Sequence, residues 1–171
     1  MEIRKTLDLQ ASDFMEFISQ LYKKLYVIIP AATVLLFAGV NLLSKEFSLP
    51  SMIFPAAVAA VFPLGLFLYM KNASKKALVS FTSANGTLNI VVNETGIKTT
   101  GKMGETSLAW RDMYKLIETK NTFFFYIQKA NAIVLPKRQL NADELSAILS
   151  VIKKEADPKK ARLLSKSLTS I

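Results

Sequence analysis

Two long stretches without a charged residue constrain this chain more than any other feature. Residues 25–43 form a stretch of 19 residues and residues 47–70 a stretch of 24. A helix needs about 20 apolar residues to cross roughly 30 Å of hydrocarbon, so both stretches are long enough. Helices of soluble proteins seldom stay apolar on every side for this length. We therefore predict a transmembrane helical hairpin over residues 25–70, and not a hairpin buried inside a soluble protein.

Lysines mark one side of the predicted hairpin. Two of them, Lys23 and Lys24, precede the first stretch, three more follow the second within residues 71–76, and the connection carries only Lys45. Cytoplasmic segments next to membrane spans carry an excess of Lys and Arg. The pattern predicts a multi-pass protein of the plasma (inner) membrane with both termini in the cytoplasm. Neither stretch contains an ionisable residue, which disfavours an ion or proton pathway.

We assign residues 1–24, which precede the first span, to an amphipathic N-terminal helix. Asp13 followed by Glu16 resembles a capping box, which predicts that the helix begins near Asp13. Four apolar residues then follow at helical spacing: Phe14, Phe17, Ile18 and Leu21. The apolar face lies either along the membrane interface or against the rest of the protein, and the sequence does not separate the two.

Residues 77–156 change to short runs of period two, which indicates strands. Turn signals occur at residues 93–96, 101–104 and 129–131, between apolar or aromatic runs. Residues 141–144 have the pattern of a helix N-cap, and the apolar residues that follow lie on one helical face. We predict six or seven antiparallel strands followed by one helix. The fold class is then α+β: a transmembrane hairpin and a small pleckstrin-homology-like (PH-like) barrel or sandwich capped by a C-terminal helix.

Composition limits the chemistry of the chain. It has no Cys and no His, which removes disulfides, thiol nucleophiles, imidazole bases and the commonest zinc ligands. No spaced nucleophile–base set or carboxylate cluster is present, so we expect neither an enzyme nor a cofactor or metal site. The net charge is +9, and residues 71–171 hold the whole excess, with 17 basic and 8 acidic side chains. A basic unit tied to a membrane most simply faces anionic headgroups. We expect no nucleic-acid binding, because Lys and Arg are not interleaved with aromatic residues.

The order of several motifs resembles the bacterial YcxB-like family. They are LAWRDM at residues 108–113, IETK at 117–120, the aromatic strand FFFYI at 123–127, and IVLPKR at 133–138 before DEL at 143–145. Members of that family similarly begin with a short polar helix and two membrane spans, so the resemblance covers nearly the whole chain. It implies a membrane-anchored PH-like domain and supplies no reaction, ligand or catalytic residue. The basic tail after Pro158 is not part of the family pattern.

Five residues of this region are candidates for contacts with lipid or with a partner protein. Trp110 either belongs to the core or stacks on a ligand. Lys137 and Arg138 lie at a strand-to-helix junction, where they form either a solvated turn or a phosphate contact, since Arg binds phosphate bidentately. Lys98 and Lys102 are similar candidates in a hairpin.

The basic C-terminal tail, residues 157–171, mixes Lys and Arg with leucines. It forms either a short amphipathic helix on anionic lipid or a solvated, unstructured tail. For the whole chain we expect a membrane-anchored interaction module that binds a partner protein, a peptide or anionic phospholipid. The alternative is a small channel or transporter subunit, which would have to assemble as a homo-oligomer because its spans carry no charge.

Overall fold

The computed structural model describes residues 2–44 and 49–164, and side chains are described for 2–43 and 53–164. It divides into two compact units. One is helical and comprises Phe14–Lys76; the other comprises Met1–Asp13 together with Ala77–Ile171 and contains both sheets. Residues 45–48, which include the charged part of the predicted connection and the first residues of the predicted second span, lie outside the described residues, as does the last part of the basic tail, residues 165–171.

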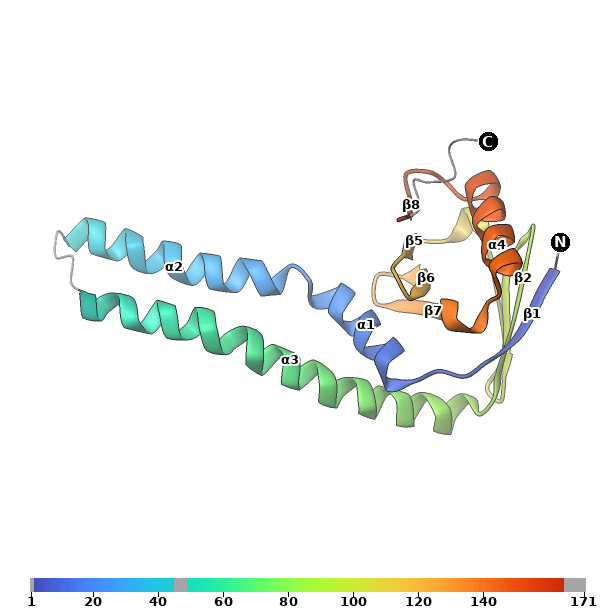
Figure 1. Cartoon of the computed structure of the whole chain (residues 1–171), viewed down its shortest axis with the longest axis horizontal. Helices are drawn as coiled ribbons and strands as arrows, with labels where there is room; N and C mark the ends of the chain where they lie inside the picture. Colours follow the sequence, from blue (N-terminus) through green and yellow to red (C-terminus); the bar gives the residue numbers. More distant parts are fainter. Residues whose placement is uncertain (1, 45–48, 165–171) are drawn as a thin grey trace. The chain divides into compact units, whose positions relative to one another are not determined.

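The helical unit confirms that both uncharged stretches form helices. Helix α1 spans Ala11–Tyr22, α2 spans Leu25–Ser44 and α3 begins at Leu49. Figure 1 shows α2 and α3 running side by side as a hairpin. Two aromatic pairs join the helices of this unit. The rings of Phe37 and Phe54 are 5.3 Å apart, and those of Tyr22 and Tyr69 are 6.3 Å apart and nearly perpendicular.

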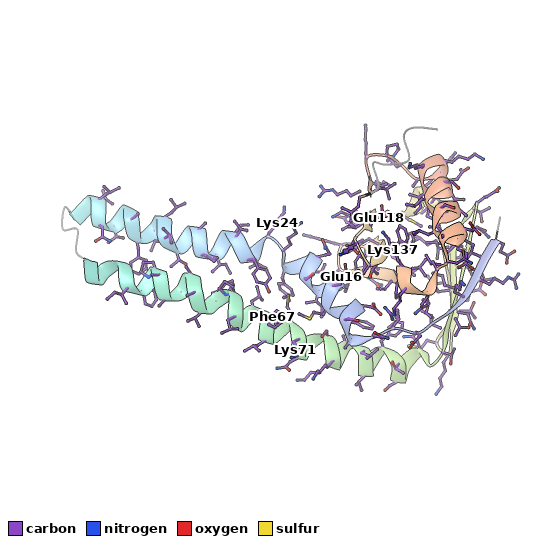
Figure 2. The ribbon with its side chains drawn as sticks, in the orientation of Figure 1. Glu16, Lys24, Phe67, Lys71, Glu118 and Lys137 are labelled. Atoms are coloured by element: carbon purple, nitrogen blue, oxygen red, sulfur yellow. The ribbon has the colours of Figure 1, made fainter. Side chains whose placement is uncertain are left out.

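Most described side chains of α2 and α3 are exposed or only partly buried, and Figure 2 shows side chains projecting outward from both helices. Two segments, Ala11–Leu43 and Ile53–Asn85, are long and apolar enough to cross a membrane, and only 6% and 11% of their apolar windows are buried. Large apolar side chains such as Leu35 and Val61 are 71% and 65% exposed. The core hairpin of a soluble protein typically buries such groups.

Helix α3 continues to Asn85, well beyond the predicted end of the second span. The period-two pattern predicted from residue 77 therefore begins later, since the first strand after the helix starts at Leu88. The helix ends at Gly86, which has φ +59° and donates its N–H to Thr82 O at 2.9 Å. Glycine adopts this left-handed conformation without a Cβ penalty, so it is a common helix stop. Sequence reasoning missed this signal.

The first sheet has the strand order β1-β2-β3-β4 and is antiparallel throughout. Its strands are β1 (Glu2–Leu7), β2 (Leu88–Asn93), β3 (Gly96–Gly101) and β4 (Gly104–Ala109). The assignment of all of residues 1–24 to a helix is thus wrong, because the first residues form β1. Residues Ile3 and Leu7 alternate with exposed neighbours and are buried, which is the period-two pattern of a strand.

The second sheet has the order β7-β6-β5-β8. A short 3-10 helix, η1 (Trp110–Asp112), leads into β5 (Lys115–Glu118), and β6 (Thr122–Gln128) and β7 (Asn131–Pro136) follow as predicted. The six strands within residues 77–156 pair in antiparallel fashion, as predicted. Strand β8 (Ala161–Arg162) lies beyond that range and pairs with β5 in parallel, which was not predicted. The described part of the tail, up to Leu164, forms no helix. The two sheets are separate, and the described strands do not close into one barrel.

Helix α4 (Ala142–Glu155) packs on the sheets and follows the 3-10 turn η2 (Lys137–Gln139). Its predicted cap is confirmed. The Asn141 side chain accepts the backbone N–H of Glu144 at 2.7 Å, and the Glu144 carboxylate accepts that of Asn141 at 2.9 Å. The two bonds form a capping box. The face that includes Ile148 and Ile152 joins residues of both sheets in one core.

Candidate functional site

Arg138 forms a clamp with a buried carboxylate, while its own side chain remains 38% exposed. Its Nη1 and Nη2 donate to the two carboxylate oxygens of Asp13, at 2.6 and 2.9 Å, and Nη2 also donates to Asp8 O at 2.6 Å. The Asp13 side chain is only 5% exposed, and it also accepts the backbone N–H of Gln10. This bidentate geometry is the one predicted for a phosphate, but an internal carboxylate takes its place.

Lys137 is likewise paired inside the protein. Its Nζ lies 2.6 Å from Oε1 of Glu118, and the Glu118 side chain is 3% exposed. The same ammonium group lies 4.9 Å from the ring centre of Phe123. The second oxygen of Glu118 accepts the backbone N–H of Leu164 at 2.9 Å. Figure 2 labels Glu118 and Lys137 next to each other in this unit. Glu118 therefore connects β5, η2 and the C-terminal segment.

Lys98 and Lys102 lie on the surface of the first sheet. Lys98 pairs with Glu105 on the neighbouring strand at 2.7 Å, and both side chains are about half exposed. Lys102 lies in the β3–β4 turn, where its side chain is exposed and its backbone N–H donates to Asn85 O at 2.9 Å. The structure does not bring either residue together with Lys137 or Arg138 in a described contact.

Trp110 belongs to the core, which confirms the first of its two predicted roles. Trp110 is only 2% exposed, and its indole N–H donates to Asn93 O at 2.9 Å. Its ring meets that of Phe125 edge to face, with ring centres 6.0 Å apart. A buried indole whose N–H is satisfied by backbone offers no surface on which a ligand can stack.

The contacts shift several pKa values. The hydrogen bonds that Arg138 donates to Asp13 raise the pKa of Arg138, so its guanidinium keeps its positive charge at every accessible pH. The pKa of Glu144 is lowered, chiefly by a hydrogen bond from Lys5 and then by the backbone N–H of Asn141. Burial raises the pKa of the Tyr126 phenol.

Sequence reasoning missed two buried carboxylates, those of Asp13 and Glu118. Asp13 was predicted to cap a helix, but it lies in the first turn of α1 and its carboxylate accepts the N–H of Gln10. Glu118 ends strand β5 after Leu116 and Ile117, and the end of such an apolar run is an unusual place for a buried charge. The position of Glu118 was therefore the sequence signal that could have revealed a buried carboxylate. Among the described residues, no group of three or more acidic side chains is arranged to hold a metal ion.

Comparison with known protein families supports the resemblance drawn from the motifs. A family model described as YcxB-like protein matches residues 92–152, from β2 to the last turns of α4. The matched segment contains Trp110, the aromatic strand β6 and the Lys137–Arg138 pair. Comparisons with curated proteins and with solved structures gave no match. Residues 92–152 of this chain are thus similar to the YcxB-like family.

Proposed function

We propose that this chain is a membrane-anchored interaction module. Its hairpin α2–α3 inserts into the bilayer, and its two-sheet unit, a PH-like domain, binds a partner protein or peptide at the cytoplasmic face. The single observation that carries the proposal is the exposure of apolar side chains along α2 and α3. Exposed apolar surface of this extent is stable in hydrocarbon and unstable in water.

The charges at the end of the hairpin support the same placement. Lys24 stands at the start of α2, and Lys71 on α3 lies toward the same end of the helical unit in Figure 2. Both side chains are exposed. Each cation close to an anionic leaflet contributes on the order of 1 kcal/mol of attraction. The lysines would therefore hold this end of the hairpin at the cytoplasmic headgroups.

The contacts of the two-sheet unit favour a protein or peptide partner over a lipid headgroup. The two cations best suited to a phosphate, Lys137 and Arg138, already neutralise the buried carboxylates of Glu118 and Asp13. A headgroup would have to displace these partners and leave a buried carboxylate without its counter-charge, which is strongly unfavourable.

Photo-crosslinking in intact cells tests both halves of this proposal. A photoreactive amino acid replaces Leu35, which is 71% exposed on α2, or Tyr114, which is 53% exposed in the two-sheet unit. We expect lipid adducts from position 35 and a discrete protein adduct from position 114. Absence of lipid adducts at position 35 would contradict the anchor. Lipid adducts at position 114, without a protein adduct, would favour headgroup binding instead.

A further inference from the structure

The C-terminal segment 160–164 lies along the outer edge of β5, where it adds a fourth strand to the second sheet. Leu116 pairs with Ala161 and Ile117 with Arg162, in parallel register. The N–H of Leu116 donates to Lys160 O at 3.0 Å, and Lys160 Nζ donates to Arg111 O at 3.1 Å. Backbone hydrogen bonds therefore hold this segment, as they would hold any extended peptide added to an open sheet edge.

Glu118 supplies a specific contact at the end of this segment. Its Oε2 accepts the backbone N–H of Leu164 at 2.9 Å, while Oε1 accepts Lys137 Nζ at 2.6 Å. The carboxylate is buried and ionically paired, so its position is fixed before a strand arrives. A charge-assisted bond to a backbone N–H is stronger than an ordinary ladder bond. It requires that the residue at this position is not proline.

The side chains of the segment alternate between the core and solvent. Ala161 and Leu163 are partly buried and pack against the core, while Arg162 and Leu164 are exposed. The edge therefore accepts a small residue followed two positions later by a leucine. Only two residues form the ladder, and a segment this short contributes few bonds to keep it in place.

We propose that the outer edge of β5 is a docking site for an extended peptide, and that the protein's own segment 160–164 fills it in the absence of a partner. The partner is an extended segment with a small residue, any residue, a leucine and then a non-proline residue, added in parallel to β5. The inference rests on the proposed interaction module and names its binding surface. Binding of the partner would therefore release segment 160–164 from the edge of β5.

Peptide binding to a shortened chain tests the site. The full chain and a variant that ends at Asp157 are purified in detergent. The probe is a fluorescent, amidated peptide of residues 158–164, PKKARLL. Because a tethered segment acts at about millimolar effective concentration, we expect the peptide to bind the shortened chain at least about tenfold more tightly than the full chain. A peptide N-methylated at Leu164 lacks the N–H that Glu118 accepts, and it should bind about tenfold more weakly.

Equal peptide affinity for both chains would overturn the proposal, and so would no binding to a shortened chain whose Trp110 fluorescence shows that it is folded. A dimer of the full chain that disappears in the shortened one would assign the site to a second copy and overturn its occupation by the chain's own segment. Cell fractionation tests membrane anchoring in a separate experiment. A chain that is not anchored can therefore be distinguished from a chain that does not bind the peptide.

Hydrogen exchange of the full chain gives a second test, which does not require the shortened variant to fold. We expect the amides of Leu116 and Leu164 to exchange at least about 100-fold faster than that of Phe125 in β6, because opening of segment 160–164 is a local event. Excess peptide PKKARLL should slow the exchange of Leu116 and leave that of Leu164 fast. Exchange of Leu116 and Leu164 at the rate of Phe125 would show that the segment is a permanent strand.

Discussion

Arg138 and Lys137 are adjacent in sequence, and each neutralises a different buried carboxylate. Arg138 binds Asp13, 125 residues away, and Lys137 binds Glu118, 19 residues away. The cations sit on the short turn η2, which lets successive side chains point in different directions. Sequence identified both residues as candidate contacts, because Arg binds phosphate bidentately. It did not identify their partners, because the pairing depends on how distant segments fold together.

Replacement of Arg138 by Met should lower the free energy of unfolding of the two-sheet unit by about 2 kcal/mol, since Asp13 would be left buried without a cation. That change corresponds to a fall of roughly 10 °C in Tm. Fluorescence of Trp110, the single tryptophan, reports the unfolding of this unit in detergent. The matched control is Lys98→Met, whose ion pair is half exposed and should contribute less than about 0.5 kcal/mol. Equal effects of the two variants would contradict the clamp.

Glu144 makes the stability of the same unit depend on pH. Its folded-state pKa lies below the ordinary value of 4.5, because Lys5 and the N–H of Asn141 favour its charged form. The contribution of ionised Glu144 to the stability of the folded unit is therefore present above pH 4.5, and it is lost as the pH falls through the folded-state pKa. The variant Glu144→Gln should have a lower Tm than the parent chain at pH 7. The difference should shrink as the pH falls below 4.5, and a difference that stays constant would refute the linkage.

Turns and the capped helix are the elements that sequence predicts best. The turns at residues 93–96, 101–104 and 129–131 and the box at Asn141 all occur as expected, because each depends only on neighbouring residues. Strands β1 and β8 were not predicted. Strand β1 pairs with β2 across about eighty residues, as in Thr6 with Asn89, and β8 is too short to show a period. Their formation depends on tertiary pairing, which local pattern does not contain.

Two turn glycines that look alike in sequence should respond differently to substitution. A Cβ on Gly96 would lie 2.2 Å from Leu108 O, so Gly96→Ala has to push β4 away from β3. We expect a loss of about 3 kcal/mol. Gly104 has φ +121° but open space around it, so Gly104→Ala should lose only about 1 kcal/mol through backbone strain. Tm values followed by Trp110 fluorescence check the order, and a reversed order would contradict this packing of β4.

The whole molecule separates an apolar helical unit from a basic two-sheet unit, and composition along the chain predicted that division. The boundary near residue 77 agrees with the division of the structure, although it falls inside α3 and not in a linker. Composition did not predict that residues up to Asp13 belong to the two-sheet unit. A fragment that begins after the hairpin therefore lacks β1, and binding studies should use the full chain.

Charges placed on the apolar helices should weaken insertion into the membrane. The variant Leu35→Arg with Val61→Arg changes one exposed apolar residue on each helix. A central Arg disfavours insertion by about 3 kcal/mol per helix. We expect less of this variant in the membrane fraction than of the control Lys98→Arg with Lys102→Arg, which keeps all charges. Equal distribution of both variants would argue that α2 and α3 do not contact lipid.

Extraction of the unmodified full chain from cells tests the central claim most directly. After lysis without detergent and ultracentrifugation, α2 and α3 should keep the chain in the membrane pellet. Alkaline carbonate should not release it, because the anchor is apolar and not ionic, whereas mild detergent should. A chain that stays in the supernatant as a well-dispersed monomer would contradict the account.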